Sequence, residues 1–285
     1  MHLNNARVVI TGASQGIGRA IALEFSGRGA RVALAARNRP ALDELASEIR
    51  DRGGEAVVIL TDVTIPDQVE RMTTETIRGL GGIDVLVNNA GVGLNASIAD
   101  AEAADVEALF RLNVLAAAST IRAVIPIMRA QQSGMIINIS SVAGRIVVPR
   151  IGYYSASKFA LAAIGDALRM EEGHRGIRVM NVFPGMTRSN FGQNRLGARG
   201  RLAHQRVPAV PAEKVARRIA AAVERNRRTL YVSWFPDRMG VAANHLAGWA
   251  VSGVLRRWAR NTDTGIDNRP PRPSPTRGEG DSDLG

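Results

Sequence analysis

Short apolar runs alternate with longer amphipathic stretches along most of this chain, and that alternation constrains its fold more than any other feature. The apolar runs lie at 6–10, 31–35, 56–60, 83–87, 135–139 and 177–183. Runs this short and this continuously apolar are typical of parallel strands buried on both faces. Between them lie stretches with helical periodicity, at 17–28, 40–51, 66–79, 102–130 and 154–172. The alternation predicts an α/β fold, a doubly wound parallel sheet flanked by helices.

A glycine-rich segment follows the first apolar run and opens the first predicted helix. It reads Thr11-Gly12-Ala13-Ser14-Gln15-Gly16-Ile17-Gly18. Glycine permits a tight turn and a close approach of the backbone to a phosphate, and a helix N-terminus offers free N–H groups and the positive end of a dipole. Such a turn can also be purely structural. Its place at the start of an α/β alternation favours dinucleotide binding in a Rossmann-like sheet.

Tyr154 and Lys158 are four residues apart in a predicted helix, so their side chains share one face. A phenol, with a pKa of about 10, is a weak acid–base catalyst at neutral pH, and a fixed cation beside it favours the phenolate. Of the 37 basic residues only Lys158 and Lys214 are lysines, which suggests a task that a guanidinium cannot perform. On its own, such a pair is more often part of an exposed helix face.

Four motifs, in order and spacing, resemble those of the short-chain dehydrogenase/reductase family. They are the glycine-rich segment, Asn88-Asn89-Ala90-Gly91, Ser140-Ser141, and Tyr154-x-x-x-Lys158, with Ser141 lying 13 residues before Tyr154. Asn113 matches the asparagine of the family's catalytic tetrad, and Pro184-Gly185 follows the sixth apolar run as it does in the family. The resemblance covers roughly residues 5 to 190.

The resemblance implies hydride transfer between a nicotinamide and a carbonyl carbon, with Asn113, Ser141, Tyr154 and Lys158 as catalytic residues. Tyr154 would exchange the proton with the substrate oxygen, which Ser141 would hold by a hydrogen bond. Lys158 would lower the pKa of the phenol and bind the nicotinamide ribose, and Asn113 would fix a water that links Lys158 to solvent. The cofactor supplies the hydride chemistry and the protein supplies orientation and electrostatics.

The same resemblance implies a set of cofactor contacts. Asp62 would meet the adenine amino group, Asn89 and Gly91 would line the ribose side, and Thr187 would approach the nicotinamide carboxamide. The full expected set is Gly12, Ser14, Gln15, Gly16, Ile17, Gly18, Arg37, Asp62, Val63, Asn89, Ala90, Gly91, Tyr154, Lys158, Pro184, Gly185 and Thr187.

The end of the second apolar run bears on the choice between NAD and NADP. An Asp or Glu there would hold the ribose 2′-hydroxyl of NAD and repel the 2′-phosphate of NADP. This chain has Ala36 and then Arg37, whose guanidinium can bind a phosphate bidentately. A solvated arginine is the plain alternative, and the glycine-rich segment has Ser14 and Gln15 where many NADP-preferring relatives have a second basic residue. NADP is the expected cofactor, ahead of NAD.

Apolar residues are expected to line the substrate pocket, which suits a small lipophilic carbonyl or secondary alcohol. They are Val92, Leu94, Val142, Ile146, Val148 and Tyr153. The segment 186–212 has five arginines and no acidic residue: Arg188, Arg195, Arg199, Arg201 and Arg206. These could bind an acidic handle on a substrate, but a solvated loop is favoured in a chain of net charge +11.

The C-terminal part departs from the family pattern. We expect a single dinucleotide-binding catalytic domain over 1–235, a helical extension over 236–260 and a disordered, proline-rich tail over 261–285. The extension could cover the pocket, form a subunit contact or lie on a membrane surface. Packing on protein is favoured, in a homodimer or homotetramer.

Composition excludes several other classes. The chain has no cysteine, so disulfides, thiol chemistry and cysteine-based zinc sites are excluded, and no metal site is expected. Only 4% of residues are aromatic and no recognition module is visible, so nucleic acid is not an expected partner. The N-terminus is not a signal peptide, and no uncharged apolar stretch of membrane-spanning length occurs, so a cytoplasmic protein is expected.

Two classes of function remain open. The first is an NADP(H)-dependent oxidoreductase acting on a free lipophilic carbonyl or secondary alcohol, with reduction of a 3-oxoacyl group on a carrier (ACP or CoA) as the runner-up. The second is a cofactor-bound sensor or scaffold that keeps the fold without turnover. The complete set of four catalytic residues favours the enzyme.

Overall fold

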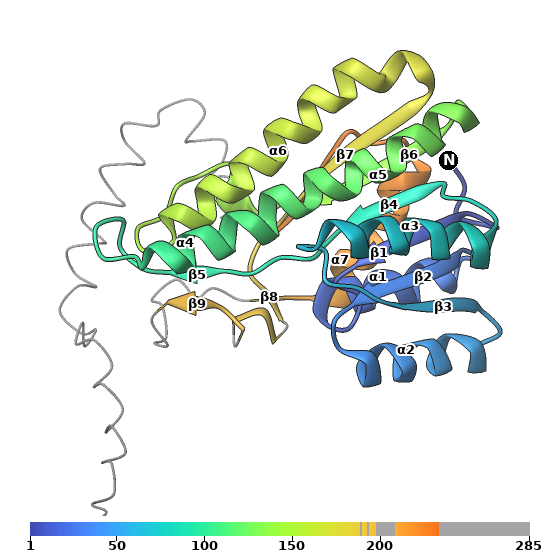
Figure 1. Cartoon of the computed structure of the whole chain (residues 1–285), viewed down its shortest axis with the longest axis horizontal. Helices are drawn as coiled ribbons and strands as arrows, with labels where there is room; N and C mark the ends of the chain where they lie inside the picture. The colour runs from blue at the N-terminus through green and yellow to red at the C-terminus, as the bar shows by residue number, and fades with distance from the viewer. Residues whose placement is uncertain (189, 193, 198–208, 234–285) are drawn as a thin grey trace, which may run out of the picture.

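The structure is a computed structural model, which describes residues 1–188, 190–192, 194–197 and 209–233. Its centre is a parallel sheet of seven strands in the order β11-β7-β6-β4-β1-β2-β3 (Figure 1). The strands are β1 (Arg7–Thr11), β2 (Arg31–Ala36), β3 (Glu55–Leu60), β4 (Val85–Asn88), β6 (Gly134–Ile139), β7 (Ile177–Pro184) and β11 (Thr229–Val232). From β1 the chain first adds β2 and β3 on one side, and then β4 on the other. This reversal makes the carboxyl ends of β1 and β4 a switch point, where doubly wound sheets bind ligands.

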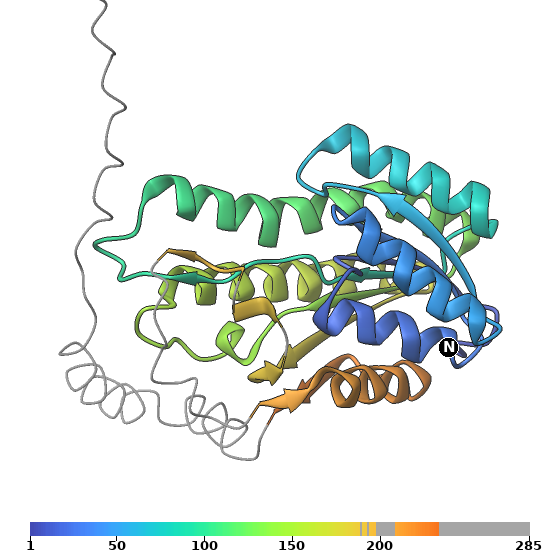
Figure 2. The same ribbon diagram turned by 90° about the horizontal axis from the view of Figure 1, so that it is seen from below.

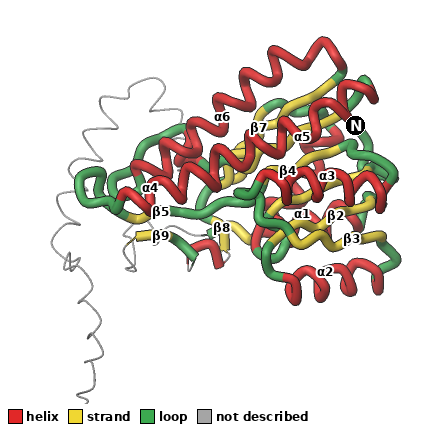
Figure 3. The backbone as a smooth tube through the Cα atoms, in the orientation of Figure 1, coloured by secondary structure: helices red, strands yellow, loops and turns green. Residues whose placement is uncertain are grey.

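Helices cover both faces of the sheet. They are α1 (Gly16–Ser26), α2 (Arg39–Asp51), α3 (Pro66–Leu80), α4 (Ala103–Phe110), α5 (Ala116–Gln131), α6 (Gly152–Glu172) and α7 (Ala212–Glu224). Figure 2 shows α1, α2 and α7 below the sheet and α5 above it, and Figure 3 shows the helices enclosing the strands. The cluster of buried residues on one face takes in side chains of α1, α2 and α7, and the cluster on the other takes in α3 and α5.

The strands are buried on both faces because successive side chains join opposite clusters. Val8 and Ile10 belong to the cluster on the face covered by α1. Val9, between them, belongs to the cluster on the opposite face, which α3 and α5 cover. All three are fully buried. This is why the strands appear in the sequence as continuous apolar runs and not as an alternation of apolar and polar residues.

A chain of buried polar side chains also crosses the sheet. Asn88, Asn138 and Asn181 are register partners on β4, β6 and β7. Asn88 Nδ2 donates to Asn138 Oδ1 at 3.1 Å, and Asn138 Nδ2 donates to Asn181 Oδ1 at 3.2 Å. The chain continues at both ends, where the Thr120 hydroxyl donates to Asn88 Oδ1 and Asn181 Nδ2 donates to Asp166 Oδ1. Each amide thus has partners for groups that would be costly to bury alone.

The predicted α/β architecture is confirmed, and each of the six predicted strands is present. The elements not predicted include strand β11, which extends the sheet beside β7, and helix α7, which packs on α1. The predicted helix over 102–130 is two helices joined by a π-helical segment, Arg111–Leu115. The predicted extension at 236–260 and tail at 261–285 lie outside the described residues.

Within the described residues, one helical stretch, Ala103–Gln131, is long and apolar enough to cross a membrane by length and composition alone. Its side chains Ile121, Val124 and Met128 pack in the core of the domain against the sheet. Its hydropathy is therefore accounted for by a core helix.

Two short parallel ribbons fix the segment after β7. Strand β8 (Thr187–Arg188) pairs with β10 (Val210–Pro211), and β5 (Leu94–Asn95) pairs with β9 (Leu196–Gly197). The segment is therefore attached at its base and, through β9, to the loop that follows β4. Arg188 and Arg195 of the basic set lie in this part, whereas Arg199, Arg201 and Arg206 lie outside the described residues.

Candidate active site

The glycine-rich segment forms a tight turn between β1 and α1. Gly12 and Gly16 have positive φ angles of 65° and 57°, a conformation that residues with a Cβ rarely adopt. Gly18 has an ordinary φ but no room, because a Cβ there would lie 2.4 Å from Asn89 Nδ2 and 2.4 Å from the Gly12 carbonyl oxygen. The predicted cofactor residues Ser14, Gln15 and Ile17 lie in this turn and the first turn of α1. The three glycines are therefore required by backbone shape and close packing.

Asn89 and Thr11 hold this turn in place. Asn89 Nδ2 donates to the carbonyl oxygens of Thr11 at 2.9 Å and Gly12 at 3.0 Å. The Thr11 hydroxyl accepts from the backbone N–H groups of Asn89 and Ala90. The side-chain amide of Asn89, which the resemblance assigns to the ribose side, thus also supports the glycine-rich turn.

Just beyond the carboxyl ends of β2 and β3, Arg37 lies beside Asp62. The guanidinium is 3.7 Å from Asp62 Oδ2, and its side chain is 75% exposed. Burial acts to raise the pKa of Asp62, but hydrogen bonds from Thr64 together with the charge of Arg37 outweigh it and lower that pKa. Asp62 is therefore a carboxylate at neutral pH, and Arg37 reaches outward next to it, where a phosphate could compete for the guanidinium.

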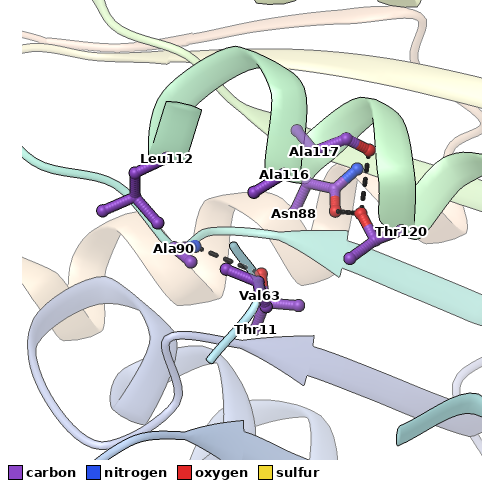
Figure 4. Close-up of a pocket in the computed structure, with 8 residues that line it drawn as sticks. All are labelled: Thr11, Val63, Asn88, Ala90, Leu112, Ala116, Ala117 and Thr120. Carbon is purple, nitrogen blue, oxygen red and sulfur yellow. Dashed lines mark hydrogen bonds between the residues drawn. The ribbon is translucent and has the colours of Figure 1, made fainter. Parts of the chain in front are cut away.

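A small pocket lies between α5 and the carboxyl ends of β1 and β4 (Figure 4). Its lining consists of Thr11, Val63, Asn88, Ala90, Leu112, Ala116, Ala117 and Thr120. It has room for about one water molecule. Two of the predicted cofactor contacts, Val63 and Ala90, are part of this lining. Its polar floor is the Asn88–Thr120 hydrogen bond of 2.6 Å.

The four predicted catalytic residues come from α6, the π-helical segment and one 3-10 turn, and the fold brings them together. Tyr154 and Lys158 lie on α6, and Lys158 Nζ is 5.9 Å from the centroid of the Tyr154 ring. Ser141, at the start of a one-turn 3-10 helix (Val142–Gly144), is hydrogen-bonded to Tyr154. Asn113 Oδ1 and Lys158 Nζ both face Gly91, and a Cβ on Gly91 would lie 3.0 Å from the first and 3.3 Å from the second. Gly91 therefore leaves open the space between these two groups.

The π-helical segment explains how Asn113 reaches the site. Its side chain spans from the helix to the loop after β4, because Asn113 Nδ2 donates to the Val92 carbonyl and Asn113 Oδ1 accepts from the Val92 N–H. Asn113 Nδ2 also donates to Ser157 Oγ, one residue before Lys158. Single π turns inside α-helices occur frequently at functional sites, since the extra residue redirects a side chain. No periodicity in the sequence indicated this turn.

Burial sets the electrostatics of the catalytic pair. It raises the pKa of Tyr154 to about 12, and the hydrogen bond with Ser141 opposes this only in part. It lowers the pKa of Lys158 to about 8. The ammonium donates to the Ile139 carbonyl at 3.0 Å and lies 5.9 Å from the centroid of the phenol ring. Desolvation is thus the largest cause of the raised Tyr154 pKa, and the lowering expected from Lys158 stays a prediction.

The ring of Phe191 lies next to that of Tyr154, a neighbour that no motif in the sequence indicated. The centroids of the two rings are 6.0 Å apart and the planes are tilted by 56°. Phe191 packs against Gly93, where a Cβ would lie 3.2 Å from its ring. Tyr153 points to the neighbouring loop, and its hydroxyl donates to the Ile98 carbonyl. Position alone could not reveal Phe191, because its contact depends on how the segment after β8 folds back.

The remaining predicted residues take varied places. Leu94 is buried in β5, and Val142, Ile146 and Val148 follow Ser141 as partly buried residues. Gly185 donates its N–H to the Val232 carbonyl, which fixes the end of β7 to β11. The Thr187 hydroxyl donates to the Gly185 carbonyl at 3.1 Å. Pro184, Gly185 and Thr187 thus form a fixed turn at the carboxyl edge of the sheet.

The fold and these side chains together define a dinucleotide-binding oxidoreductase. The sequence profile described as short chain dehydrogenase matches residues 6–199. An uncharacterized oxidoreductase of Staphylococcus saprophyticus is 38% identical over 205 residues, which cover 71% of this chain and 87% of the relative. The chain therefore belongs to the short-chain dehydrogenase/reductase family, as the motifs predicted.

Solved structures agree with this assignment. A short-chain dehydrogenase/reductase from Burkholderia phymatum, in complex with NAD, is 25% identical, has a TM-score of 0.76, and the match covers 96% of this chain and 100% of that one. A metagenomic short-chain oxidoreductase, in complex with NADP, is 31% identical with a TM-score of 0.69, and the match covers 82% of this chain and 98% of that one.

Proposed function

We propose that this protein is an NADP(H)-dependent oxidoreductase that transfers a hydride between the nicotinamide and a carbonyl or secondary alcohol of a lipophilic substrate. The observation that carries the proposal is the convergence of Asn113, Ser141, Tyr154 and Lys158 beside the glycine-rich turn. A sensor or scaffold would need the nucleotide cleft but not this arrangement of acid, base and hydrogen-bond donors.

The glycine-rich turn and the space at Gly91 support binding of a dinucleotide. Backbone shape and close packing require glycine at the turn before α1, where helix N–H groups face a phosphate position. Gly91 leaves a space bounded by Lys158 Nζ and Asn113 Oδ1, which suits a ribose hydroxyl and a water molecule. A bound nicotinamide would supply or accept the hydride.

The chain's own residues would handle the proton. With a pKa of about 12, Tyr154 carries its proton at neutral pH and is ready to donate it to a substrate oxygen. Ser141 would hold that oxygen beside the phenol. Lys158 would bind the ribose and, through Asn113, exchange protons with solvent. In the reverse direction the phenolate would accept the proton of the alcohol.

Arg37 supports NADP as the cofactor. It is the exposed cation next to Asp62, and no carboxylate occupies the end of β2, where Ala36 lies. The relatives of known structure include one that binds NAD and one that binds NADP, so these local contacts carry the preference. Phe191, packed on Tyr154, gives the substrate side an aromatic cover and favours an apolar carbonyl.

NADPH consumption against a panel of apolar ketones and aldehydes tests the proposal. Tyr154→Phe removes the proton donor and should lower kcat at least about a hundredfold, with NADPH binding by fluorescence nearly unchanged. Tyr153→Phe is the matched control, because its hydroxyl bonds only a loop carbonyl in the described structure, and it should retain most of the activity. Turnover by Tyr154→Phe close to that of the wild type would refute the assigned role.

A further inference from the structure

The segment that carries Ser141 is attached to α6 near Lys158. The Ser140 hydroxyl donates to the Lys158 carbonyl at 2.9 Å. Gly144, at the end of the 3-10 turn, is so close that a Cβ there would lie 2.9 Å from the same carbonyl oxygen. These contacts hold the segment 140–144 at one place, the Lys158 carbonyl. A second contact elsewhere is needed to prevent the segment from rotating about that place.

Arg145 provides a second point. It follows the 3-10 turn directly, and its N–H donates to the Val142 carbonyl at 2.9 Å. Its guanidinium lies 4.5 Å from the centroid of the Phe183 ring and 3.5 Å from Asp166 Oδ2. The side chain is 30% exposed. A guanidinium between an aromatic face and a carboxylate is restrained in both position and orientation.

Both partners of Arg145 are themselves held firmly. Phe183 is fully buried and stacks on Tyr231, with centroids 5.0 Å apart and planes at 21°. Asp166 Oδ1 accepts from Arg169 NH1 at 2.7 Å and from Asn181 Nδ2 at 2.9 Å. Through Asn181, Asp166 is joined to the asparagine chain that crosses the sheet.

These contacts run along one helix in order. Ser141 meets Tyr154 in the first turn of α6, Gly144 meets Lys158, and Arg145 meets Asp166. Lys158 and Asp166 are eight residues apart, about two turns, and so share one face. The position of the Ser141 hydroxyl relative to the Tyr154 phenol therefore depends on the contacts that hold Arg145, four residues further along the chain.

We propose that Arg145 and Asp166 form a positioning pair that fixes the Ser141 hydroxyl relative to Tyr154. The proposal rests on the proposed function, since Ser141 acts there on the substrate oxygen. Neither residue needs to touch substrate or cofactor. Their effect is exerted through the turn Val142–Gly144, which the pair connects to α6 and to β7.

Arg145→Met tests the pair, because it keeps much of the side-chain length and removes the charge. We expect kcat for the carbonyl substrate to fall by about 10- to 100-fold, as displacement of a reacting group by a fraction of an ångström can cause, with KM for NADPH within about twofold. Arg145→Lys retains a cation over Phe183 and should restore most of the loss. Arg129→Met, which removes an ion pair at the far end of α6, is the control for lost stability and should leave kcat unchanged.

Two further measurements separate positioning from general damage. In a Ser141→Ala background, Arg145→Met should reduce the remaining turnover by less than about twofold, because the pair acts through Ser141. An equal loss in both backgrounds would overturn the proposal.

Hydrogen–deuterium exchange tests the pair without any need for turnover. Arg145→Met should speed exchange over 141–150 while α6 stays protected, and unchanged exchange over 141–150 would also overturn the proposal. An inactive wild type with accelerated exchange in the variant would refute the proposed function and leave the positioning pair standing.

Discussion

At several positions of the candidate site, the space around a residue limits which side chain it can have. Gly91 illustrates this, because the side chain it lacks would lie between Asn113 and Lys158. Tyr154 and Lys158 illustrate the electrostatic counterpart: burial moves their pKa values in opposite directions, to about 12 and about 8, because it disfavours the charged form of each. Burial therefore favours the neutral form of both groups.

Gly91→Ala is predicted to impair turnover without unfolding the protein. The added methyl would lie 3.0 Å from Asn113 Oδ1 and 3.3 Å from Lys158 Nζ, in the space assigned to a ribose hydroxyl and water. We expect kcat/KM to fall at least about tenfold, corresponding to about 1.4 kcal/mol. Gly173→Ala is the matched control, because a Cβ there meets nothing within 4 Å. Full activity of Gly91→Ala would show that the space is not used.

Arg37→Ala is predicted to weaken the use of NADPH selectively. Loss of a guanidinium that binds the 2′-phosphate should lower kcat/KM for NADPH about tenfold or more and leave the value for NADH within about twofold. Arg39→Ala is the control, since Arg39 is exposed nearby and pairs with Asp43 on α2. A wild type that used both cofactors equally would contradict the preference.

Helices and strands act as supports that bring distant residues to one place. The π-helical segment between α4 and α5 turns Asn113 toward Val92 and Ser157, and so joins the loop after β4 to α6. At the opposite end of α6, Glu172 is almost completely buried. Its carboxylate forms ion pairs with Arg129 of α5 and with Arg175, in the turn that follows α6. The two ends of α6 are thus fixed by different means, one near the site and one far from it.

Glu172 is predicted to make stability depend on acid pH. Hydrogen bonds from Arg129 lower its pKa from 4.5 to about 2. A lowered folded-state pKa stabilises the fold fully above the unfolded value, and this contribution is lost as the pH falls from 4.5 toward 2. Glu172→Gln should cost about 2 kcal/mol at pH 7, a moderate value because both arginines are partly exposed.

Thermal unfolding across the acid range checks this prediction. The difference in Tm between wild type and Glu172→Gln should be largest at neutral pH and shrink as the pH falls below the unfolded-state value. Glu107→Gln is the control, because its i,i+4 pair with Arg111 is exposed and should contribute little at any pH. A difference in Tm that did not vary with pH would contradict the assignment.

The whole molecule is organised around the switch point between β1 and β4. The glycine-rich turn, the pocket of Figure 4 and the Gly91 space all lie at the carboxyl ends of these two strands or of their neighbours. The asparagine chain ties β4, β6 and β7 together just before they leave the sheet. The candidate site therefore lies where neighbouring strands are joined by both backbone and side-chain hydrogen bonds.

Removal of 261–285 is predicted to leave folding and turnover unchanged. This stretch has four prolines and no aromatic residue, so it offers little apolar surface to offset ordering. Removal of 236–285 should instead change the oligomeric state or the substrate affinity, because 236–260 has apolar residues at helical spacing. Light scattering after size-exclusion chromatography measures the first effect and steady-state kinetics the second. If the full chain floated with liposomes and a variant without residues 236–260 did not, a membrane contact would be favoured instead.

The sequence by itself determined the fold class, six of the strands and the residues that meet in the cleft. Periodicity carries this information because burial on both faces requires continuous apolar runs, and motif spacing carries the rest. The family resemblance was decisive for Asn113 and Ser141, which no local pattern marks as partners of Tyr154. Strand β11 was missed because a run of only four residues gives a weak periodic signal. Helix α7 could have been predicted, since Val215, Ile219 and Val223 recur at helical spacing.

Tertiary structure alone decided the rest. The π turn at Asn113, the cover of Tyr154 by Phe191, and the contacts of Arg145 with Phe183 and Asp166 join residues far apart in the chain. The degree of burial was also decided there: spacing places Tyr154 and Lys158 on one helix face, and packing around them raises the pKa of the phenol. Spacing reports which side chains share a helix face, but desolvation depends on everything packed around them.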